Sequence, residues 1–153
     1  MNVETNKNDV KSENERKKEY LRSYQNCSRR IKRTESEIDE IRSMKMYPSM
    51  QDDGMPHGSG QADLSGYAAE LTKLEDELYK EGVDQVKLYK DITWKIQQLE
   101  DENERDVLFY RYIKGENWWR IAELTGYSER QIFRIHGDAL KNLKITKDVS
   151  ECQ

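Results

Sequence analysis

Several residue types that define whole classes of protein are scarce in this chain. Its 153 residues include only two cysteines and two prolines. Neither Cys27 nor Cys152 lies in a CxxC motif or a Cys/His cluster, which argues against a disulfide framework and a structural zinc site. No apolar run approaches the length of a membrane span, and the first residues lack the apolar core of a signal peptide. We therefore expect a cytoplasmic protein that has no cofactor and does not bind a membrane.

Charged residues are abundant instead. They make up 37% of the chain, and hydrophobic residues make up 35%. With so few prolines and only eight glycines, this composition is typical of a mostly helical protein with little material for a thick core. We therefore predict an all-α fold in which the helices bury apolar stripes.

The net charge of −4 is unevenly distributed. Residues 1–48 carry a net charge of +3, residues 49–101 carry −7, residues 102–147 carry +2 and residues 148–153 carry −2. An acidic total argues against coating of nucleic acid by charge alone. It permits a small DNA-binding surface at one end of the chain.

The first half of the chain predicts a long helix after a disordered start. Residues 1–14 show no apolar pattern, and we expect them to be disordered. From Glu15 onward, apolar and small side chains recur at alternating steps of four and three, the heptad pattern of a helix that packs along another helix. These positions are Tyr20, Tyr24, Cys27, Ile31, Thr34, Ile38 and Ile41.

A second heptad pattern follows later in the chain. Its positions are Leu64, Ala68, Leu71, Leu78, Tyr89, Ile92, Ile96 and Leu99. Polar residues and Gly82 interrupt the pattern over residues 81–85, which predicts a kink or a slack point. Two helices of similar length joined by one loop predict an antiparallel helical hairpin, a coiled coil, over residues 15–100. Basic residues 29–33 would then lie near acidic residues 70–81 of the same chain or of another chain.

The predicted loop of this hairpin, residues 47–62, has an unusual composition. It holds both prolines and three of the eight glycines, and it is long for a helix–helix connection. In or beside it lie Met44, Met46, Met50, Asp52, Asp53, Met55 and His57. Three interpretations stay open: a flexible tip, a recognition loop with adaptable methionines, and a metal site, for which these ligands are few.

The last third of the chain predicts three short helices. An acidic run opens the first helix, and Gly115 ends it. The second helix begins after the cap residue Asn117 and ends at Gly126, where the turn needs a positive φ. Ser128 opens the third helix, and Gln131 completes a capping box with it.

The spacing of small and apolar residues indicates what these helices form. Ala122, Gly126, Ile132 and Ile135 match a helix-turn-helix, in which the second helix enters the major groove of DNA. The expected core residues are Leu108, Tyr112, Ile121, Leu124, Ile132, Ile135, Ala139, Leu140 and Leu143. We predict a DNA-binding module over residues 101–147 and a tail over 148–153; a plain helical hairpin within a bundle is the alternative.

The segment LEDENERDVLFYRYIKGENWWRIAELTGYSERQIFRIHGDALKNL, residues 99–143, resembles region 4 of sigma-70-type factors. The shared features are the acidic lead-in, the Tyr-Arg-Tyr helix end, the Ile-Ala-Glu-Leu-x-Gly-Tyr-Ser segment and the closing Ala-Leu-Lys-Asn-Leu. Trp118 and Trp119 depart from the usual Ser-Tyr or Ser-Trp pair. The regions with which a sigma factor melts promoters are absent, so the chain is no complete sigma factor.

The remainder of the chain is similar to small proteins of phages and prophages of Firmicutes. The similarity lies in the segment from Tyr20 to Tyr24 and in the Met/Pro/Gly-rich stretch from Met44 to Gln61. Related phage proteins of the ArpU and RinA types are regarded as late transcription regulators. The resemblance implies a protein of the bacterial host cytoplasm with double-stranded DNA as its partner and RNA polymerase as a further candidate.

If the helix after Ser128 enters the major groove, the side chains that point away from its apolar stripe meet the bases. The predicted base contacts are Ser128, Glu129, Arg130, Gln131, Phe133 and Arg134. Arg130 and Arg134 can each bond a guanine edge, and Gln131 suits adenine. Phe133 can meet a thymine methyl group or pack on the module itself. The predicted DNA backbone contacts are Trp119, Arg120, Lys141 and Lys144.

The leading hypothesis is a sequence-specific DNA-binding transcription regulator. We expect no enzymatic activity, because the sequence shows no nucleophile–base pair and no phosphate-binding glycine loop. One alternative is a phage DNA-packaging protein of the small-terminase type, and another is an RNA polymerase-binding adaptor without its own DNA specificity. A module with so few basic residues would bind weakly alone, which predicts a homodimer through the helical hairpin.

Overall fold

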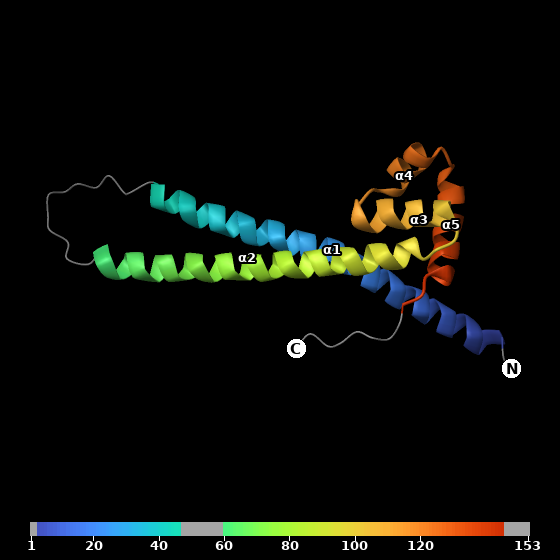
Figure 1. Cartoon of the computed structure of the whole chain (residues 1–153), viewed down its shortest axis with the longest axis horizontal. Helices are drawn as coiled ribbons and strands as arrows, with labels where there is room; N and C mark the ends of the chain where they lie inside the picture. Colours follow the sequence, from blue (N-terminus) through green and yellow to red (C-terminus); the bar gives the residue numbers. More distant parts are fainter. Residues whose placement is uncertain (1–2, 47–59, 146–153) are drawn as a thin grey trace. The chain divides into compact units, whose positions relative to one another are not determined.

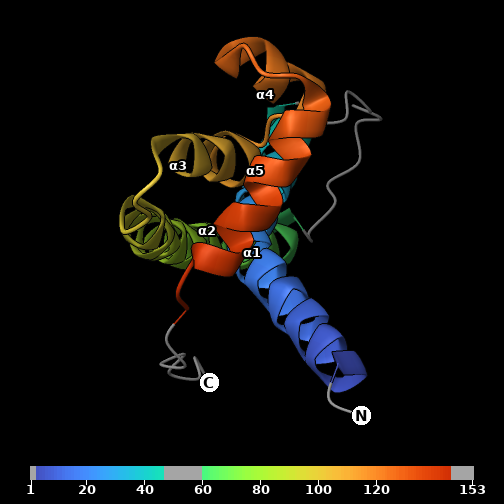
Figure 2. The ribbon, with the colours of Figure 1, turned by 90° about the vertical axis from the view of Figure 1, so that its right-hand side faces the viewer.

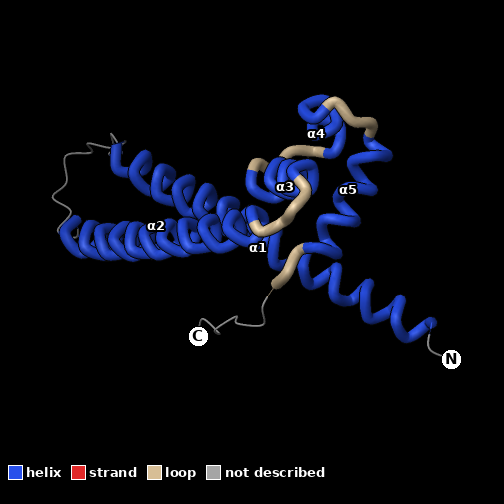
Figure 3. Tube along the Cα trace, turned by 45° about the vertical axis from the view of Figure 1, so that its right-hand side comes forward, coloured by secondary structure: helices blue, strands red, loops and turns tan. Residues whose placement is uncertain are grey.

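The computed structural model describes the backbone of residues 3–46 and 60–145 and the side chains of residues 9–44 and 66–145. Within these ranges all regular structure is helical (Figure 3), so the prediction of an all-α fold is confirmed there. None of the described helices is long and apolar enough to cross a membrane. Most of the predicted loop 47–62, with its metal-site interpretation, and the tail 148–153 lie outside the described residues.

Two long helices are followed by a group of short ones (Figure 1). The elements are α1 (Val3–Met46), α2 (Gly60–Gln97), α3 (Glu102–Leu108), the π-helical turn η1 (Phe109–Ile113), α4 (Trp118–Thr125) and α5 (Glu129–Asn142). They form two compact units, the core unit (residues 1–26 and 86–153) and the helix-pair unit (residues 27–85).

The first helix begins earlier than the sequence pattern predicts. It starts at Val3, whereas residues 1–14 are predicted to be disordered. A formed helix extends at little cost, because each further residue adds one hydrogen bond once the nucleus exists. Ion pairs within α1 join Lys17 to Glu13 at 3.2 Å and Lys18 to Glu15 at 2.7 Å, which favours this extension.

In the helix-pair unit, α1 and α2 run in opposite directions side by side (Figure 1). Polar contacts fix this direction: Arg42 lies 2.8 Å from Glu75, and the Thr34 hydroxyl donates to Glu81 at 3.1 Å. Arg30 lies 3.8 Å from Glu81, so one basic residue of the 29–33 group does face the acidic stretch of α2.

A kink or slack point is predicted at residues 81–85, and the structure shows that α2 continues through them as one helix. Glu81 and Gln85 face α1 and find partners there. Gln85 donates to the Ser28 hydroxyl at 2.8 Å, and the Glu81 carboxylate accepts from Thr34. The heptad positions therefore stay directed at α1 although apolar residues are missing from them.

The register of the second heptad pattern also needs correction. Ala68, a predicted inward position, is exposed, and Leu74 is buried with 7% of its surface exposed. In the core unit, Tyr89 is 43% exposed, and its neighbour Leu88 packs against the core. Leu74 and Leu88 meet the heptad spacing, and neither is among the predicted positions.

The core unit assembles around two apolar clusters. Figure 2 shows the helices α3, α4 and α5 that contribute to them. The larger cluster draws on α1, α2, the α3–η1 segment and α5, and the smaller one joins α3, α4 and α5. The buried members of the larger cluster are Leu21, Ile92, Ile96, Leu99, Leu108, Tyr112, Ile113, Ala139, Leu140 and Leu143. Those of the smaller cluster are Val107, Ile121 and Ile132. Leu124, predicted to be a core residue, is 44% exposed, because Ile121 alone fills the buried side of the short helix α4.

The predicted helix over residues 102–114 is divided in the structure into α3 and η1. The Lys114 amide donates to the Phe109 carbonyl, five residues back, which is the π-helical pattern. Gly115 then ends the turn with a φ of +73°, as predicted for a helix end. From α1, the Gln25 amide donates to the terminal carbonyls of Tyr112 and Ile113.

Candidate nucleic-acid interface

The helices α4 and α5 begin at the residues that the sequence predicts, and α4 also ends at the predicted residue. The Asn117 side chain accepts from the Arg120 amide at 2.8 Å, and Gly126 takes a φ of +74° at the end of α4. Ser128 and Gln131 form a reciprocal capping box at the start of α5. All three predictions are confirmed, and the turn between the helices follows from side chains that replace missing backbone partners.

The buried side of α5 determines which side chains the helix presents outward. Ile132, His136, Ala139, Leu140 and Leu143 are buried. With 3.6 residues per turn, the opposite side carries Arg130, Arg134, Gly137 and Lys141, at steps of four, three and four. We call these four residues the outer stripe of α5.

Two arginines of the outer stripe are free to bind an external partner. Arg130 and Arg134 are exposed. Among the residues with described side chains, neither guanidinium has a hydrogen-bond or ion-pair partner. The side chains stand one helical turn apart on the same side of α5, as required of two groups that contact neighbouring base pairs.

The other predicted base contacts lie at the first turns of α5 and are all exposed. The Ser128 hydroxyl and the Gln131 carbonyl oxygen are held in the capping box, where Gln131 accepts from the Ser128 amide at 2.9 Å. Phe133 is 50% exposed, and its ring lies 5.0 Å from that of Trp118. The packing predicted for Phe133 is therefore present, and the exposed half of its surface leaves the predicted thymine contact as a prediction. Glu129 occupies the first turn, where a negative charge suits the helix dipole.

The predicted DNA backbone contacts differ in how far they are engaged within the chain. Trp119 is 61% exposed, and Lys144 is exposed. Arg120 forms an ion pair with Glu123, and Lys141 lies 3.3 Å from Asp138. Both ion pairs are exposed pairs within one helix, which contribute little to stability and can exchange for a phosphate.

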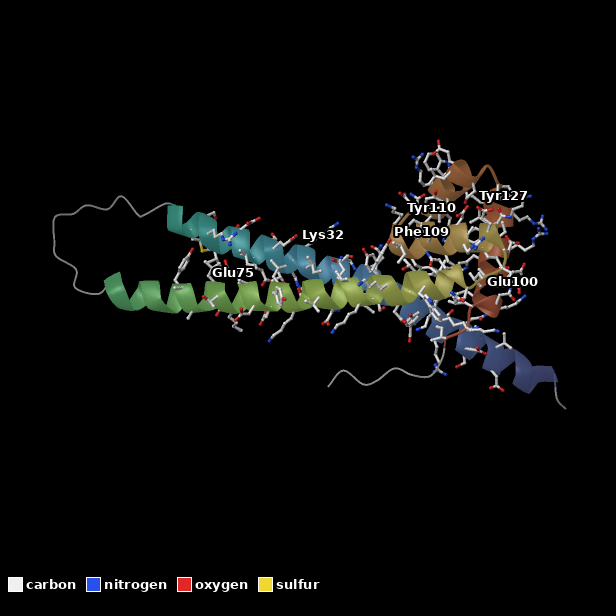
Figure 4. All side chains as sticks on the ribbon, viewed as in Figure 1. Lys32, Glu75, Glu100, Phe109, Tyr110 and Tyr127 are labelled. Carbon is white, nitrogen blue, oxygen red and sulfur yellow. The ribbon has the colours of Figure 1, made fainter. Side chains whose placement is uncertain are left out.

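Acidic side chains limit this surface on one side. A polar crevice between α3 and α5 is lined by Asp101, Glu104, Asp138 and Arg134, among others. Tyr127, labelled in Figure 4, also lines it, and its hydroxyl donates to Asn103 at 3.2 Å. Because carboxylates repel phosphates, a nucleic acid would meet α5 along the outer stripe and not over this crevice.

A buried histidine lies behind the candidate interface. His136 is 8% exposed and shares a 2.9 Å hydrogen bond with the Tyr112 hydroxyl. The Trp118 ring meets the His136 imidazole edge-on, with 4.8 Å between the ring centroids. The Arg111 guanidinium lies over the Trp118 ring, 4.5 Å from its centroid. Burial, together with the nearby charges of Lys18, Arg111 and Arg22, lowers the pKa of His136 to about 4.

A second buried polar residue, Lys17, ties α1 to the end of α5. Its ammonium group donates to the Leu140 carbonyl at 2.8 Å and to the Lys141 carbonyl at 3.5 Å. The last carbonyls of a helix lack partners within it and carry a partial negative charge, which a cation stabilises. The sequence pattern did not predict Lys17 as a buried residue, and it left His136 as either a surface or a packing residue, of which the structure shows packing. The only available indication for Lys17 was its place three residues before Tyr20, in phase with the first heptad pattern.

The described residues offer no metal centre, because no three His, Cys, Asp or Glu side chains among them converge. Comparison with protein families, with curated proteins and with solved structures finds no match to this chain. The surface of α5 and its chemistry therefore carry the functional argument.

Proposed function

We propose that this chain is a sequence-specific DNA-binding transcription regulator of the phage or prophage type, in which α4 and α5 act as a sigma-region-4-like helix-turn-helix. The observation that carries the proposal is the pair of exposed arginines, Arg130 and Arg134, without partners among the described side chains. An arginine side chain left free in this way can bond the O6 and N7 atoms of guanine in the major groove.

The arrangement of α5 supports this role. Its capped start places Arg130 in the first turn, and its buried side is anchored to the smaller apolar cluster through Ile132. A helix held rigidly on one side can insert the other side into a groove without losing much side-chain freedom. Lys141 lies in the last turn of α5 and Lys144 lies two residues beyond its end, and both suit phosphates.

The arginine pair gives a direct test. Arg130→Ala and Arg134→Ala should each relax the sequence preference at one base position and cost about 1–3 kcal/mol of binding free energy. The measurement is selection of duplexes from a random-sequence pool, followed by binding titrations at one fixed salt concentration. Arg33→Ala, a change of an exposed arginine in α1, is the matched control and should leave the preference unchanged.

An unchanged preference in both α5 variants would refute the assignment of α5 as the recognition helix. Genome-wide mapping of bound sites separates the remaining functions. Promoter sites support regulation, and a single site at the packaging region supports a small-terminase role. Pull-down of RNA polymerase without DNA binding supports an adaptor.

We further propose that the chain acts as a homodimer, because one weakly basic module needs a second half-site to bind firmly. In the helix-pair unit, α1 and α2 pack against each other, so the sides that face each other are not open to a second copy. The outer side of α2 carries Tyr79 and Val83, which are 75% and 38% exposed, and this side suits a second copy. Sedimentation equilibrium at binding concentrations tests the proposal, and a monomer there contradicts it.

A further inference from the structure

Gly137 is a glycine that the fold itself does not require. It lies in the interior of α5, where glycine is less favourable than any residue except proline. Its φ is not among the positive values, which belong to Gly115 and Gly126. A Cβ atom added to Gly137 would meet no atom within 4 Å. No contact within the described chain therefore explains the missing side chain.

The position of Gly137 on α5 suggests an explanation outside the chain. It belongs to the outer stripe, three residues after Arg134 and four residues before Lys141. The stripe thus presents bare helix backbone between basic side chains. Glycine is the residue that allows another molecule to approach a backbone closely.

We propose, on the basis of the DNA-binding function proposed above, that Gly137 is the point where α5 comes closest to the sugar–phosphate backbone of duplex DNA. Arg130 and Gly137 are seven residues apart, or roughly 10 Å along the helix axis, close to the ~12 Å width of the major groove. With Arg130 at the base edges, Gly137 meets the wall of the groove. Lys141, one turn further, then reaches the phosphates.

This placement predicts how substitutions at Gly137 act. A Cβ atom would hold α5 away from the groove wall, and the Lys141 contact would lengthen for every DNA sequence alike. The change should therefore weaken binding without altering sequence preference, in contrast to a change of Arg130. The stability of the fold should increase in the Gly137→Ala variant, because alanine is the better helix residue and its Cβ atom has room.

Gly82 provides the matched control. It too lies inside a helix, α2, and a Cβ atom there also meets nothing within 4 Å. Unlike Gly137, Gly82 does not belong to the outer stripe of α5. Gly137→Ala and Gly82→Ala should each raise the midpoint of thermal unfolding by about 3 °C, and only Gly137→Ala should affect binding.

The experiment uses the full chain, a duplex selected by the wild-type chain from a random-sequence pool, and a scrambled duplex of equal length. Gly137→Ala should lower the affinity for both duplexes by the same factor, about tenfold, the effect of losing one charge-assisted contact. Gly137→Leu should lower both affinities further. Gly82→Ala should bind as the wild type does.

The outcomes separate this inference from the function on which it rests. If the wild-type chain binds neither duplex, the DNA-binding function fails and the role of Gly137 fails with it. If the wild type binds and Gly137→Ala binds equally well, only the close approach at Gly137 is overturned. It is also overturned if the loss of affinity accompanies a lower unfolding midpoint, since the glycine would then serve the fold.

Discussion

Acidification from pH 7 to pH 5 should destabilise the core unit through the imidazole of His136. The ordinary pKa of 6.5 applies to His136 in the unfolded chain, and in the folded chain burial lowers this pKa to about 4. Between these two values the unfolded chain binds a proton that the folded chain does not. The contribution of neutral His136 to the free energy of unfolding is therefore fully present above pH 6.5, and it is lost as the pH falls towards 4.

The size of the effect follows from the two pKa values. The difference between the unfolded-state and folded-state pKa values is equivalent to about 3 kcal/mol of unfolding free energy. Of this, about 2 kcal/mol is lost between pH 7 and pH 5. The surroundings reinforce the direction, because Lys18, Arg22 and Arg111 repel an imidazolium. Tyr112 keeps its proton, since burial raises the pKa of its hydroxyl, and this hydroxyl shares a hydrogen bond with the neutral imidazole.

Urea unfolding at pH 7 and pH 5, followed by circular dichroism, measures this loss. His136→Gln removes the titration and retains a hydrogen-bonding side chain, so it should lower stability at pH 7 and flatten the dependence between the two pH values. The chain has one other histidine, and His57→Gln is the matched control that should keep the full dependence. A His136→Gln variant that still loses about 2 kcal/mol at pH 5 would refute the reasoning.

Two further substitutions test contacts that tie α1 to the core unit. Lys17→Met removes the ammonium group from the Leu140 carbonyl and should cost about 1–2 kcal/mol of unfolding free energy, whereas Lys11→Met, at an exposed position of the same helix, should cost nothing measurable in the same urea titration. Gly115→Ala places a side chain at a φ of +73° and a Cβ atom 3.2 Å from Gln25, so it should cost at least about 1–2 kcal/mol by thermal unfolding. Equal stability of Lys17→Met and wild type, or of Gly115→Ala and wild type, contradicts the respective contact.

Local patterns in the sequence predicted the helix boundaries around the candidate site well. The caps at Asn117 and Ser128 and the turn at Gly126 each depend on a side chain or φ value that acts within a few residues. Such interactions need no knowledge of the rest of the fold. The first heptad pattern was also local, and its central residues Cys27, Thr34 and Ile38 are buried in the helix-pair unit.

The errors occurred where packing between distant segments overrides local pattern. Leu124 fits an apolar stripe, but α4 is too short to bury two such positions, and Ile121 takes the buried one. The heptad positions Glu81 and Gln85 are polar, yet α2 continues through them, and Thr34 and Ser28 of α1 supply their hydrogen-bond partners. The sequence shows the polar residues but not the partners that lie far away along the chain.

Two buried polar residues also show how the candidate DNA-binding helix is held. Lys17 caps the end of α5 from α1, and His136 joins α5 to the Tyr112 hydroxyl of η1. Apolar contacts alone tolerate small rotations of a helix, whereas hydrogen bonds to particular atoms do not. Rotation of α5 by one residue position would turn the side that carries Arg130 and Arg134 by about 100° relative to the rest of the core unit. The residues that fix the outer stripe in place are thus buried polar groups from α1 and η1, and the arginines depend on them without touching them.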